Sequence, residues 1–408
     1  MTLSPIRTSS GPLYALAFSM LISSMGSSIA NVGLPTLTAA FHASFPQMQW
    51  VVLAYLLAVT ASVLVMGWLG DRFGRQRLLA WGVLLFSIAS LGCGLATQIG
   101  WLIAARILQG LGGAMMMANT LALAIQVLPP DRTGRAMGLL GTVSAIGTAL
   151  GPALGGVLIA AFGWQALFLV NLPLGLLAWG LVQHYLPHTA VAGTVTPGGS
   201  LLALLRQRVL MRGLLMSMAV TTVMMTTFIV GPFYLSHGLQ LSPRQIGLVM
   251  AVGPLVAALS GVPAGRLVDR YGAQFTTAGG LAAVAGGCLL LAILPQRAEV
   301  AGYIAGLILL TMGYALFQAA NNTALLKGAD PARRGLVSGL MNLGRNLGFI
   351  VGAALMAAVY GATVKYGDFS PIQASSHGLR ITFLLAGMIV LGAMLFLHGN
   401  GMRDRQRR

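Results

Sequence analysis

Long apolar segments recur along the 408 residues of this chain and constrain its fold more than any other feature. A bilayer core is crossed by a helix of about 20 mostly apolar residues, whose backbone polar groups pair within the helix. The segments of this kind lie at 13–37, 47–69, 78–97, 100–127, 136–161, 164–185, 210–236, 244–266, 274–295, 299–326, 335–361 and 378–398. The sequence therefore predicts an all-α membrane protein with 12 transmembrane helices.

The scarcity of charge excludes soluble classes of protein. Charged residues make up 8% of the chain and hydrophobic residues 57%, whereas a soluble domain carries roughly 25% charged residues. The net charge of +17 comes from short basic clusters between apolar runs, and a nucleic-acid-binding protein instead gathers its basic residues on one face. We therefore expect a lipid bilayer around the chain and no nucleic-acid partner.

Lys and Arg are distributed asymmetrically between the connecting segments. If the N-terminus is cytoplasmic, 18 of them lie in cytoplasmic segments and 4 on the other side. The positive-inside rule then places both termini in the cytoplasm. Arg outnumbers Lys by 22 to 2, which is typical of a GC-rich bacterial genome. The expected location is thus a bacterial inner membrane.

The two halves of the chain repeat each other. Gly67–Gly74 matches Gly265–Gly272 at an offset of 198 residues, and glycines of 134–151 match those of 335–352 at an offset of 201. We predict two pseudo-symmetric six-helix bundles, 1–186 and 210–408, joined by a cytoplasmic linker at 187–209, with a short basic cytoplasmic tail at the end. Parallel repeats place a substrate site near the bilayer midplane between them and favour alternating access by rocking.

Three motifs resemble those of the major facilitator superfamily. Gly67–Arg77 resembles its cytoplasmic loop motif between helices two and three, and Arg106–Gly110 resembles its fourth-helix motif. Gly147–Gly156 resembles the fifth-helix motif of the superfamily's proton antiporters. Segments 29–35 and 163–175 look most like the drug:proton antiporter branch, which usually has fourteen spans. The resemblance implies the major facilitator fold and a transport function.

The loop motif and its repeat predict a cytoplasmic gate. Glycine permits a tight turn, and Asp71 can accept hydrogen bonds from a helix N-terminus. By the repeat, Asp71 is expected to contact the eleventh helix near Arg333, and Asp269 the fifth helix near Arg135. The alternative is a positive-inside loop with one stray acid. The predicted gating residues are Gly67, Asp71, Arg72, Gly74, Arg75, Asp269, Arg270 and Arg333.

Arg106, Gly147, Gly151 and Pro152 are predicted coupling residues. An arginine inside a span normally faces the protein interior or a water-filled cavity, and the resemblance gives Arg106 a role in coupling or proton movement; the alternative is snorkelling to the membrane interface. Glycines spaced by four residues let two helices touch, and Pro152 bends its helix. The resemblance makes this run a periplasmic seal against proton leak, whereas its spacing alone indicates helix packing.

Polar residues of helices one, four, seven and ten are the candidate substrate contacts, as the resemblance implies. All seven acids fall in loops or at helix ends. The resemblance implies that Gly26 stands where related fourteen-span drug exporters carry an aspartate in helix one. A lipophilic cation therefore fits poorly. Arg345, in helix eleven, either lines the cavity or bonds facing carbonyls. The predicted contacts are Ser27, Asn31, Gln109, Asn119, Thr222, Thr226, Gln318, Asn321, Asn322 and Arg345.

These features favour a secondary active transporter rather than an enzyme, since no catalytic arrangement or phosphate-binding loop is apparent. The first interpretation is proton-coupled efflux of a small amphipathic neutral, zwitterionic or anionic compound by alternating access. The second is uptake or uniport of a neutral or anionic nutrient, such as a vitamin or organic acid. The third is a transporter-like ligand sensor without turnover. We expect a monomer with no cofactor and no metal.

Overall fold

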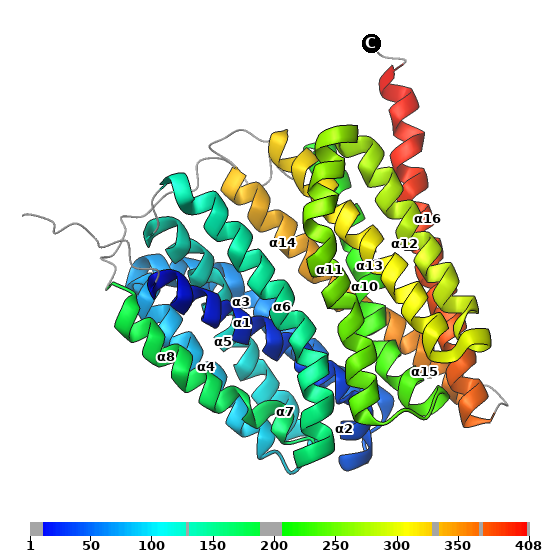
Figure 1. Cartoon of the computed structure of the whole chain (residues 1–408), viewed down its shortest axis with the longest axis horizontal. Coiled ribbons are helices and arrows are strands. Elements are labelled where there is room, and N and C mark those ends of the chain that lie inside the picture. The colour runs from blue at the N-terminus through cyan, green and yellow to red at the C-terminus, as the bar shows by residue number, and fades with distance from the viewer. Residues whose placement is uncertain (1–10, 128–129, 188–205, 329–333, 367–369, 406–408) are drawn as a thin grey trace, which may run out of the picture.

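The computed structural model describes residues 11–127, 130–187, 206–328, 334–366 and 370–405, and every regular element in these ranges is a helix. Figure 1 shows the helices in two groups, an N-terminal half and a C-terminal half. Within the described residues, eleven helices are long and apolar enough to cross a membrane. A further helix carries a shorter apolar stretch, Ile146–Phe162. The predicted all-α membrane fold is confirmed.

The described part of the first half contains eight helical segments. They are α1 (Gly11–Val32), α2 (Leu34–Ala40), α3 (Phe45–Phe73), α4 (Arg75–Gly94), α5 (Ile99–Val127), α6 (Pro130–Phe162), α7 (Ala166–Leu169) and α8 (Asn171–Tyr185). The first predicted span, 13–37, is interrupted at Gly33, where α1 gives way to α2. Pro35 explains the break, because it has no N–H to donate to the carbonyl of Asn31 four residues earlier.

The second half repeats this order after residues 188–205, which include most of the predicted linker and lie outside the described residues. Its helices are α10 (Arg208–Phe233), α11 (Pro243–Tyr271), α12 (Ala273–Ile293), α13 (Pro295–Lys327), α14 (Arg334–Val351), α15 (Ala357–Tyr366) and α16 (Pro371–Arg405). One-turn π-helices at Tyr234–Gly238 and Gly352–Met356 continue α10 and α14.

The internal repeat is visible in the helix ends. Ser44 precedes α3 and Ser242 precedes α11, and each forms a capping box with a glutamine three residues later. Each of these helices has 29 residues and ends at a glycine with a positive φ, 94° at Gly74 and 81° at Gly272. Only glycine adopts this conformation without strain. The loop glycines of the two motifs therefore have the same structural role.

Glycines also bring equivalent helices together inside each half. A Cβ added at Gly147 of α6 would lie 2.6 Å from the carbonyl oxygen of Leu21 in α1. A Cβ at Gly352 would lie 2.5 Å from the carbonyl oxygen of Thr222 in α10. Small residues allow such backbone contact between helices in lipid. The pairs α1–α6 and α10–α14 are thus built on the same principle.

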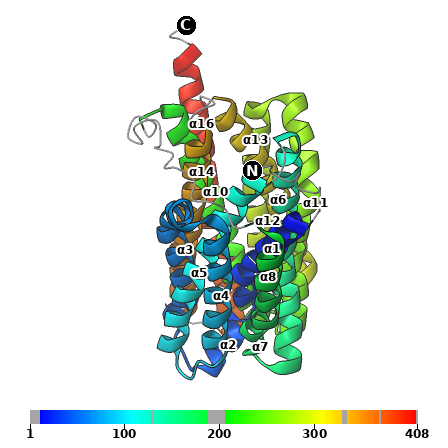
Figure 2. The same cartoon turned by 90° about the vertical axis from the view of Figure 1, so that its left-hand side faces the viewer.

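The two halves meet closely at one end of the molecule. There Phe45 of α3 packs against Phe233 and Tyr360, with ring centroids 4.7 Å and 5.6 Å apart. A Cβ at Gly156 of α6 would lie 2.5 Å from the carbonyl oxygen of Pro243 in α11. We call this the seal end, and the end that carries Gly67–Arg77 the motif end. Figures 1 and 2 show α2 at the seal end and the C-terminal part of α16 at the motif end.

Candidate functional site

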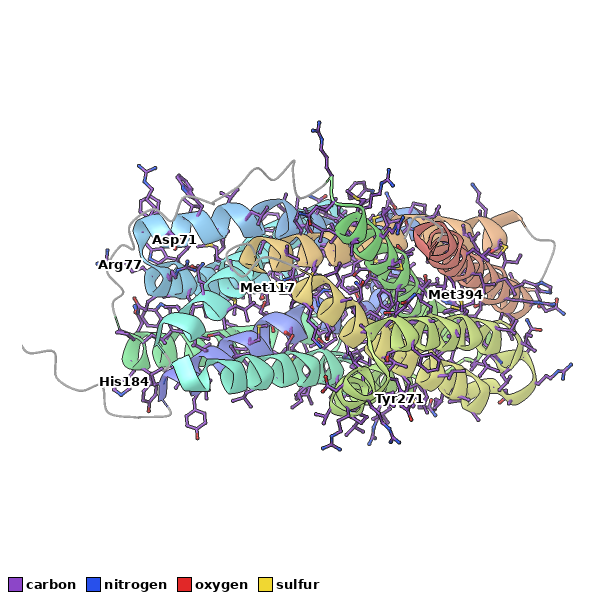
Figure 3. All side chains as sticks on the ribbon, turned by 90° about the horizontal axis from the view of Figure 1, so that it is seen from above. Asp71, Arg77, Met117, His184, Tyr271 and Met394 are labelled. Atoms are coloured by element: carbon purple, nitrogen blue, oxygen red, sulfur yellow. The ribbon has the colours of Figure 1, made fainter. Side chains whose placement is uncertain are left out.

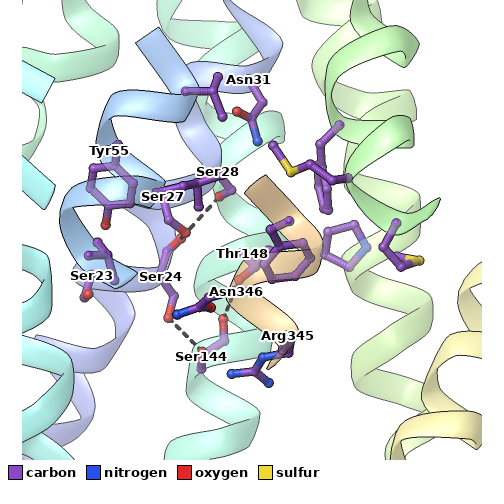
Figure 4. A pocket seen from close by; sticks show the side chains of 18 of the residues that line it. Ser23, Ser24, Ser27, Ser28, Asn31, Tyr55, Ser144, Thr148, Arg345 and Asn346 are labelled. Atoms are coloured by element: carbon purple, nitrogen blue, oxygen red, sulfur yellow. Dashed lines mark hydrogen bonds between the residues drawn. The ribbon is translucent and has the colours of Figure 1, made fainter. Parts of the chain in front are cut away.

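A cavity of about 380 Å³ lies between the two halves. It is lined by α1, α3, α5 and α6 of the first half and by α10, α11, α13 and α14 of the second (Figure 4). The expected helices one, four, seven and ten correspond to α1, α5, α10 and α13. Helices two, five, eight and eleven also contribute, so each half supplies four helices.

The first half provides a wall of hydroxyl groups. The Ser24 hydroxyl lies 2.7 Å from that of Ser144 and so links α1 to α6. Ser27 donates to the carbonyl of Ser24 at 2.7 Å, and Thr148 donates to the carbonyl of Ser144 at 3.0 Å. Because the protons of Ser27 and Thr148 are used within the protein, the lone pairs of these two oxygens are left as acceptors toward the cavity. Ser28 follows the same pattern, donating to the Met25 carbonyl at 3.2 Å.

The second half provides a largely apolar wall with one cation. Met224, Met225 and Phe228 of α10 face the cavity, together with Phe349 of α14. Arg345 is the single charged side chain among the described residues that line it. Its Nη2 donates to Asn342 Oδ1 at 2.7 Å, while its Nε is buried without a partner. The cavity is therefore positively charged and contains no lining carboxylate from the described residues.

Three of the ten predicted substrate contacts, Ser27, Asn31 and Arg345, line this cavity. Asn31 is 4% exposed, and its Oδ1 has no hydrogen-bond partner. A buried polar atom without a partner costs free energy, so the group is suited to bind a ligand atom. The structure places these three side chains, from α1 and α14, around one cavity.

The other seven lie away from the cavity lining: Gln109, Asn119, Thr222, Thr226, Gln318, Asn321 and Asn322. Most of them bond within their own half. Asn119 donates to the Met115 carbonyl at 2.8 Å and Asn321 to the Gly213 carbonyl at 3.1 Å. Thr222 donates to the Gly348 carbonyl at 3.1 Å.

Two more of these residues, Thr226 and Gln318, form hydrogen bonds within their own helices. Thr226 donates to the Thr222 carbonyl at 3.1 Å. Gln318 donates to the Tyr314 hydroxyl at 3.0 Å, and Tyr314 itself lines the cavity. Asn322 is exposed.

Arg106 of α5 is completely buried, so it does not snorkel to an interface. Its Nε donates to the Val51 carbonyl at 2.9 Å and its Nη1 to Gln109 Oε1 at 2.5 Å. Gln109 in turn donates to Ser90 Oγ at 2.7 Å. The guanidinium lies 4.3 Å from the centre of the Tyr55 ring, and Tyr55 lines the cavity. Arg106 is thus in contact with the cavity wall without lining the cavity.

Gly26 lies in the same cluster. Its carbonyl oxygen is 3.5 Å from Arg106 Nη1. A Cβ at this position would collide with the Phe86 ring. This packing therefore leaves no room for a larger side chain at Gly26.

The predicted gating residues that the structure describes lie at two separated helix junctions, α3–α4 and α11–α12. Asp71 pairs with Arg75 in its own motif at 2.5 Å, and Arg72 stacks over Trp68. A Cβ added at Gly67 would meet open space, and Asp269 and Arg270 are exposed. Figure 3 shows Asp71 well apart from Tyr271, the neighbour of Arg270. Arg333 lies outside the described residues, so the contact expected between it and Asp71 stays a prediction.

The predicted coupling run on α6 has two faces. Gly147 and Gly151 pack against α1, the latter beside Ser28. The Pro152 carbonyl instead lies against Gly247 of α11, and Gly156 faces the same helix. The run therefore contributes both to packing within the first half and to the closed seal end.

Several lining residues were missed by sequence reasoning, namely Tyr55, Ser144, Thr148, Thr311 and Asn346. Ser144 and Thr148 precede and interrupt the glycine run of α6, and Asn346 directly follows Arg345. For these three residues, the position beside a motif was the available signal in the sequence. Among the residues that the structure describes, no group of three His, Cys, Asp or Glu side chains could hold a metal ion.

Comparisons with known proteins agree with this geometry. A family model described as Major Facilitator Superfamily matches residues 16–353. The riboflavin transporter RibZ of Clostridioides difficile (strain 630) is 28% identical, with 87% of this chain and 89% of that protein covered. The multidrug resistance protein Stp of Mycobacterium tuberculosis (strain CDC 1551 / Oshkosh) is 28% identical, covering 87% of this chain and 76% of that protein.

A third relative is the methylenomycin A resistance protein of Streptomyces coelicolor, 26% identical over 92% of this chain and 89% of that protein. Among solved structures, a bacterial homolog to the human lysosomal transporter Spinster, in an inward-facing and occupied conformation, has a TM-score of 0.82 at 16% identity. It covers 98% of both chains and shows the shared fold. The chain belongs to the major facilitator superfamily and is a membrane transporter rather than an enzyme.

Proposed function

We propose that this protein is a secondary active transporter that exports a small amphipathic neutral, zwitterionic or anionic compound in exchange for protons by alternating access. The observation that carries the proposal is the cavity between the halves, where Arg345 is the single charged side chain of the described lining. A cation in a low-dielectric site disfavours a second cation and favours an anion. Lipophilic cations are therefore poor substrates.

The proposed orientation places the motif end in the cytoplasm of a bacterium, with both termini on that side of the inner membrane. The excess of Lys and Arg in the segments assigned to this side supports it,. The aromatic and glycine contacts between the halves lie at the seal end, so the structure fits a cytoplasm-facing state. Residues 1–186 and 210–408 would then rock as two bundles of a monomer about this cavity.

The proposed gate uses the two loop motifs in the alternate state. In this structure Asp71 pairs with Arg75 of the same motif. The Asp71 carboxylate would exchange this partner for one on the other half when the motif end closes. The matching loop around Asp269 and Arg270 would act on the first half in the same way, and Arg333 would receive Asp71. Gly67, Arg72 and Gly74 shape the first loop.

The proposed coupling element is Arg106 with its buried neighbours. Arg106 contacts the cavity through the Tyr55 ring, so a change in the cavity can be transmitted to the helices whose carbonyls it binds. Gly147, Gly151 and Pro152 hold α6 against α1 and α11, and would limit proton leak by keeping the seal end tight. The chain's resistance-protein relatives support the outward direction.

Uptake is the second candidate function, and the relative named as a riboflavin transporter favours it. A small organic nutrient would suit the same hydroxyl-lined, cationic cavity. A carrier that rocks between two states runs in whichever direction its gradients set, so the cavity alone fits both directions. The two proposals differ in whether proton movement opposes or follows the substrate.

Energised inverted membrane vesicles containing a pH-sensitive dye test the proposal. Panels of neutral, anionic and cationic compounds are added, and substrate-dependent proton efflux is recorded against vesicles without the protein. Export predicts a response to anionic or neutral compounds and none to cations. Uptake or uniport predicts silence in the panels together with labelled-substrate entry into right-side-out vesicles. A ligand sensor would bind compounds and move none of them in either preparation.

A further inference from the structure

The cavity has a different polar group at each end, and this arrangement narrows the class of substrate. We propose that it recognises an elongated amphipathic acid, whose acid group binds Arg345 and whose hydrogen-bond donor, at the other end, binds Asn31. This inference rests on the proposed transport function and deepens it, because a neutral compound then binds more weakly than the corresponding acid.

Arg345 forms the acid-binding end. A guanidinium has five N–H donors arranged to hold a carboxylate by two parallel bonds. One is used on Asn342 Oδ1 at 2.7 Å, and Nε is buried without a partner. A charge inside a membrane protein normally has a partner, yet no described residue that lines the cavity carries a negative charge. The acid group of the substrate is therefore the missing counter-charge.

Asn31 forms the donor-binding end. Its side chain is 4% exposed, lines the cavity, and leaves Oδ1 without a partner. One turn earlier in α1, the hydroxyls of Ser27 and Ser28 donate to carbonyls of their own helix. Their oxygens are therefore acceptors, like Asn31 Oδ1. These acceptor oxygens are complementary to an N–H or O–H group of the substrate.

The spacing of the two ends sets the length of the substrate. Figure 4 shows Arg345 and Asn31 apart, and Ser144, which lines the cavity together with Arg345, bonds Ser24 of α1 at 2.7 Å. Asn31 follows Ser24 by seven residues, which is about 10 Å along a helix that rises 1.5 Å per residue. Phe349, Phe228 and Met225 face the cavity from the second half. An aromatic or otherwise flat apolar body fits between the two polar ends.

A rigid probe series separates these contributions. The parent probe is 4′-aminobiphenyl-4-carboxylate, which carries an amine and a carboxylate at opposite ends of a flat rod. Its methyl ester lacks the anion, and biphenyl-4-carboxylate lacks the donor. Binding is measured by calorimetry on the purified full chain in lipid nanodiscs, for the wild type, Arg345→Met, Asn31→Leu and the exposed-arginine control Arg244→Met.

The wild type and Arg244→Met are expected to bind the parent acid about tenfold or more tighter than its ester, as one charge-assisted hydrogen bond provides. Arg345→Met should bind acid and ester equally while keeping its ester affinity. Asn31→Leu should keep the acid-over-ester ratio and lose the advantage of the amine. Equal binding of acid and ester by the wild type, or no binding of any probe, overturns the inference even if a variant fails to fold.

A transport measurement distinguishes this failure from failure of the proposed function. If the probes follow the expected binding pattern but none crosses the membrane in energised vesicles, the transport proposal is wrong and the recognition site stands. If neutral compounds are exported and the acid has no advantage, the transport proposal stands and the recognition site is wrong.

Discussion

The helix pair α4–α5 of the first half and the equivalent pair α12–α13 of the second half are packed with different side chains. In the first half, a Cβ at Gly112 of α5 would lie 2.9 Å from the Gly82 carbonyl of α4, and in the second half, Gly313 and Gly280 make the same contact at 2.8 Å. Residues of α5 therefore match residues of α13 that are 201 positions later. By this register the buried Arg106 and Gln109 correspond to Leu307 and Leu310.

The remaining members of the Arg106 cluster are also replaced. Ser90 corresponds to the buried Cys288, and Tyr55 corresponds to Gly253. The second half thus packs the same helices with apolar side chains. Since the fold does not require the polar cluster, its presence in one half points to a task other than packing. This asymmetry supports the proposal that Arg106 serves coupling.

Replacing the polar residues of the Arg106 cluster with their counterparts from the second half should have the largest effect on stability. Arg106→Leu leaves the amide oxygen of Gln109 unpaired in the interior, which costs about 1–3 kcal/mol. The triple change Arg106→Leu, Gln109→Leu and Ser90→Cys installs the residues of the second half and should recover most of this loss. Thermal unfolding in detergent micelles measures both variants. A triple variant no more stable than the single one would show that the halves are not interchangeable in packing.

Two glycines of α6 separate packing within the first half from contact between the halves. Gly151 contacts α1 inside the first half, whereas Gly156 contacts α11 across the seal end. Gly151→Val should destabilise the protein by about 1–3 kcal/mol through overpacking. Gly156→Val should change the melting temperature less and open the seal end. Spin labels at Ala40→Cys and Gln240→Cys report that opening, because the native Cys93 and Cys288 are buried. An unchanged label distance would place the seal elsewhere.

The smallest expected effect on stability concerns the equivalent acids of the two loop motifs, Asp71 and Asp269. Asp71 has Arg75 four residues later, while the equivalent position after Asp269 is Ala273. Asp71→Asn should therefore lower the free energy of unfolding by about 0.3–0.5 kcal/mol, as for other i,i+4 pairs, and Asp269→Asn should leave it unchanged. Both should slow initial transport rates if the loops gate the alternate state. Wild-type rates in both variants would contradict the gating proposal.

The fold could be predicted from the sequence, because helix length and apolar content follow directly from the thickness of the bilayer. The break at Gly33 was missed although Pro35 was visible, since the apolar run continues through it. The candidate site was predicted less well. In a helix that is apolar on all sides, hydropathy does not show which face meets the other half. Arg345 stood out because charge is rare in a span, whereas Ser144 resembled an ordinary packing residue.

Some buried polar residues were wrongly predicted to contact the substrate. Gln109, Asn119 and Asn321 were expected in the cavity, but each bonds inside its own half. In lipid, a polar side chain that holds two helices together looks the same in sequence as one that binds a substrate. Only the positions of the neighbouring helices distinguish the two.

Uphill transport by the triple variant tests the central claim most directly. Wild type and the triple variant are reconstituted in liposomes with an imposed pH gradient, and accumulation of a labelled 4′-aminobiphenyl-4-carboxylate is measured together with its equilibrium exchange. The proposed coupling role predicts accumulation above equilibrium by the wild type alone, with exchange retained in both. Equal accumulation by the triple variant would show that the polar cluster of the first half is not the coupling element.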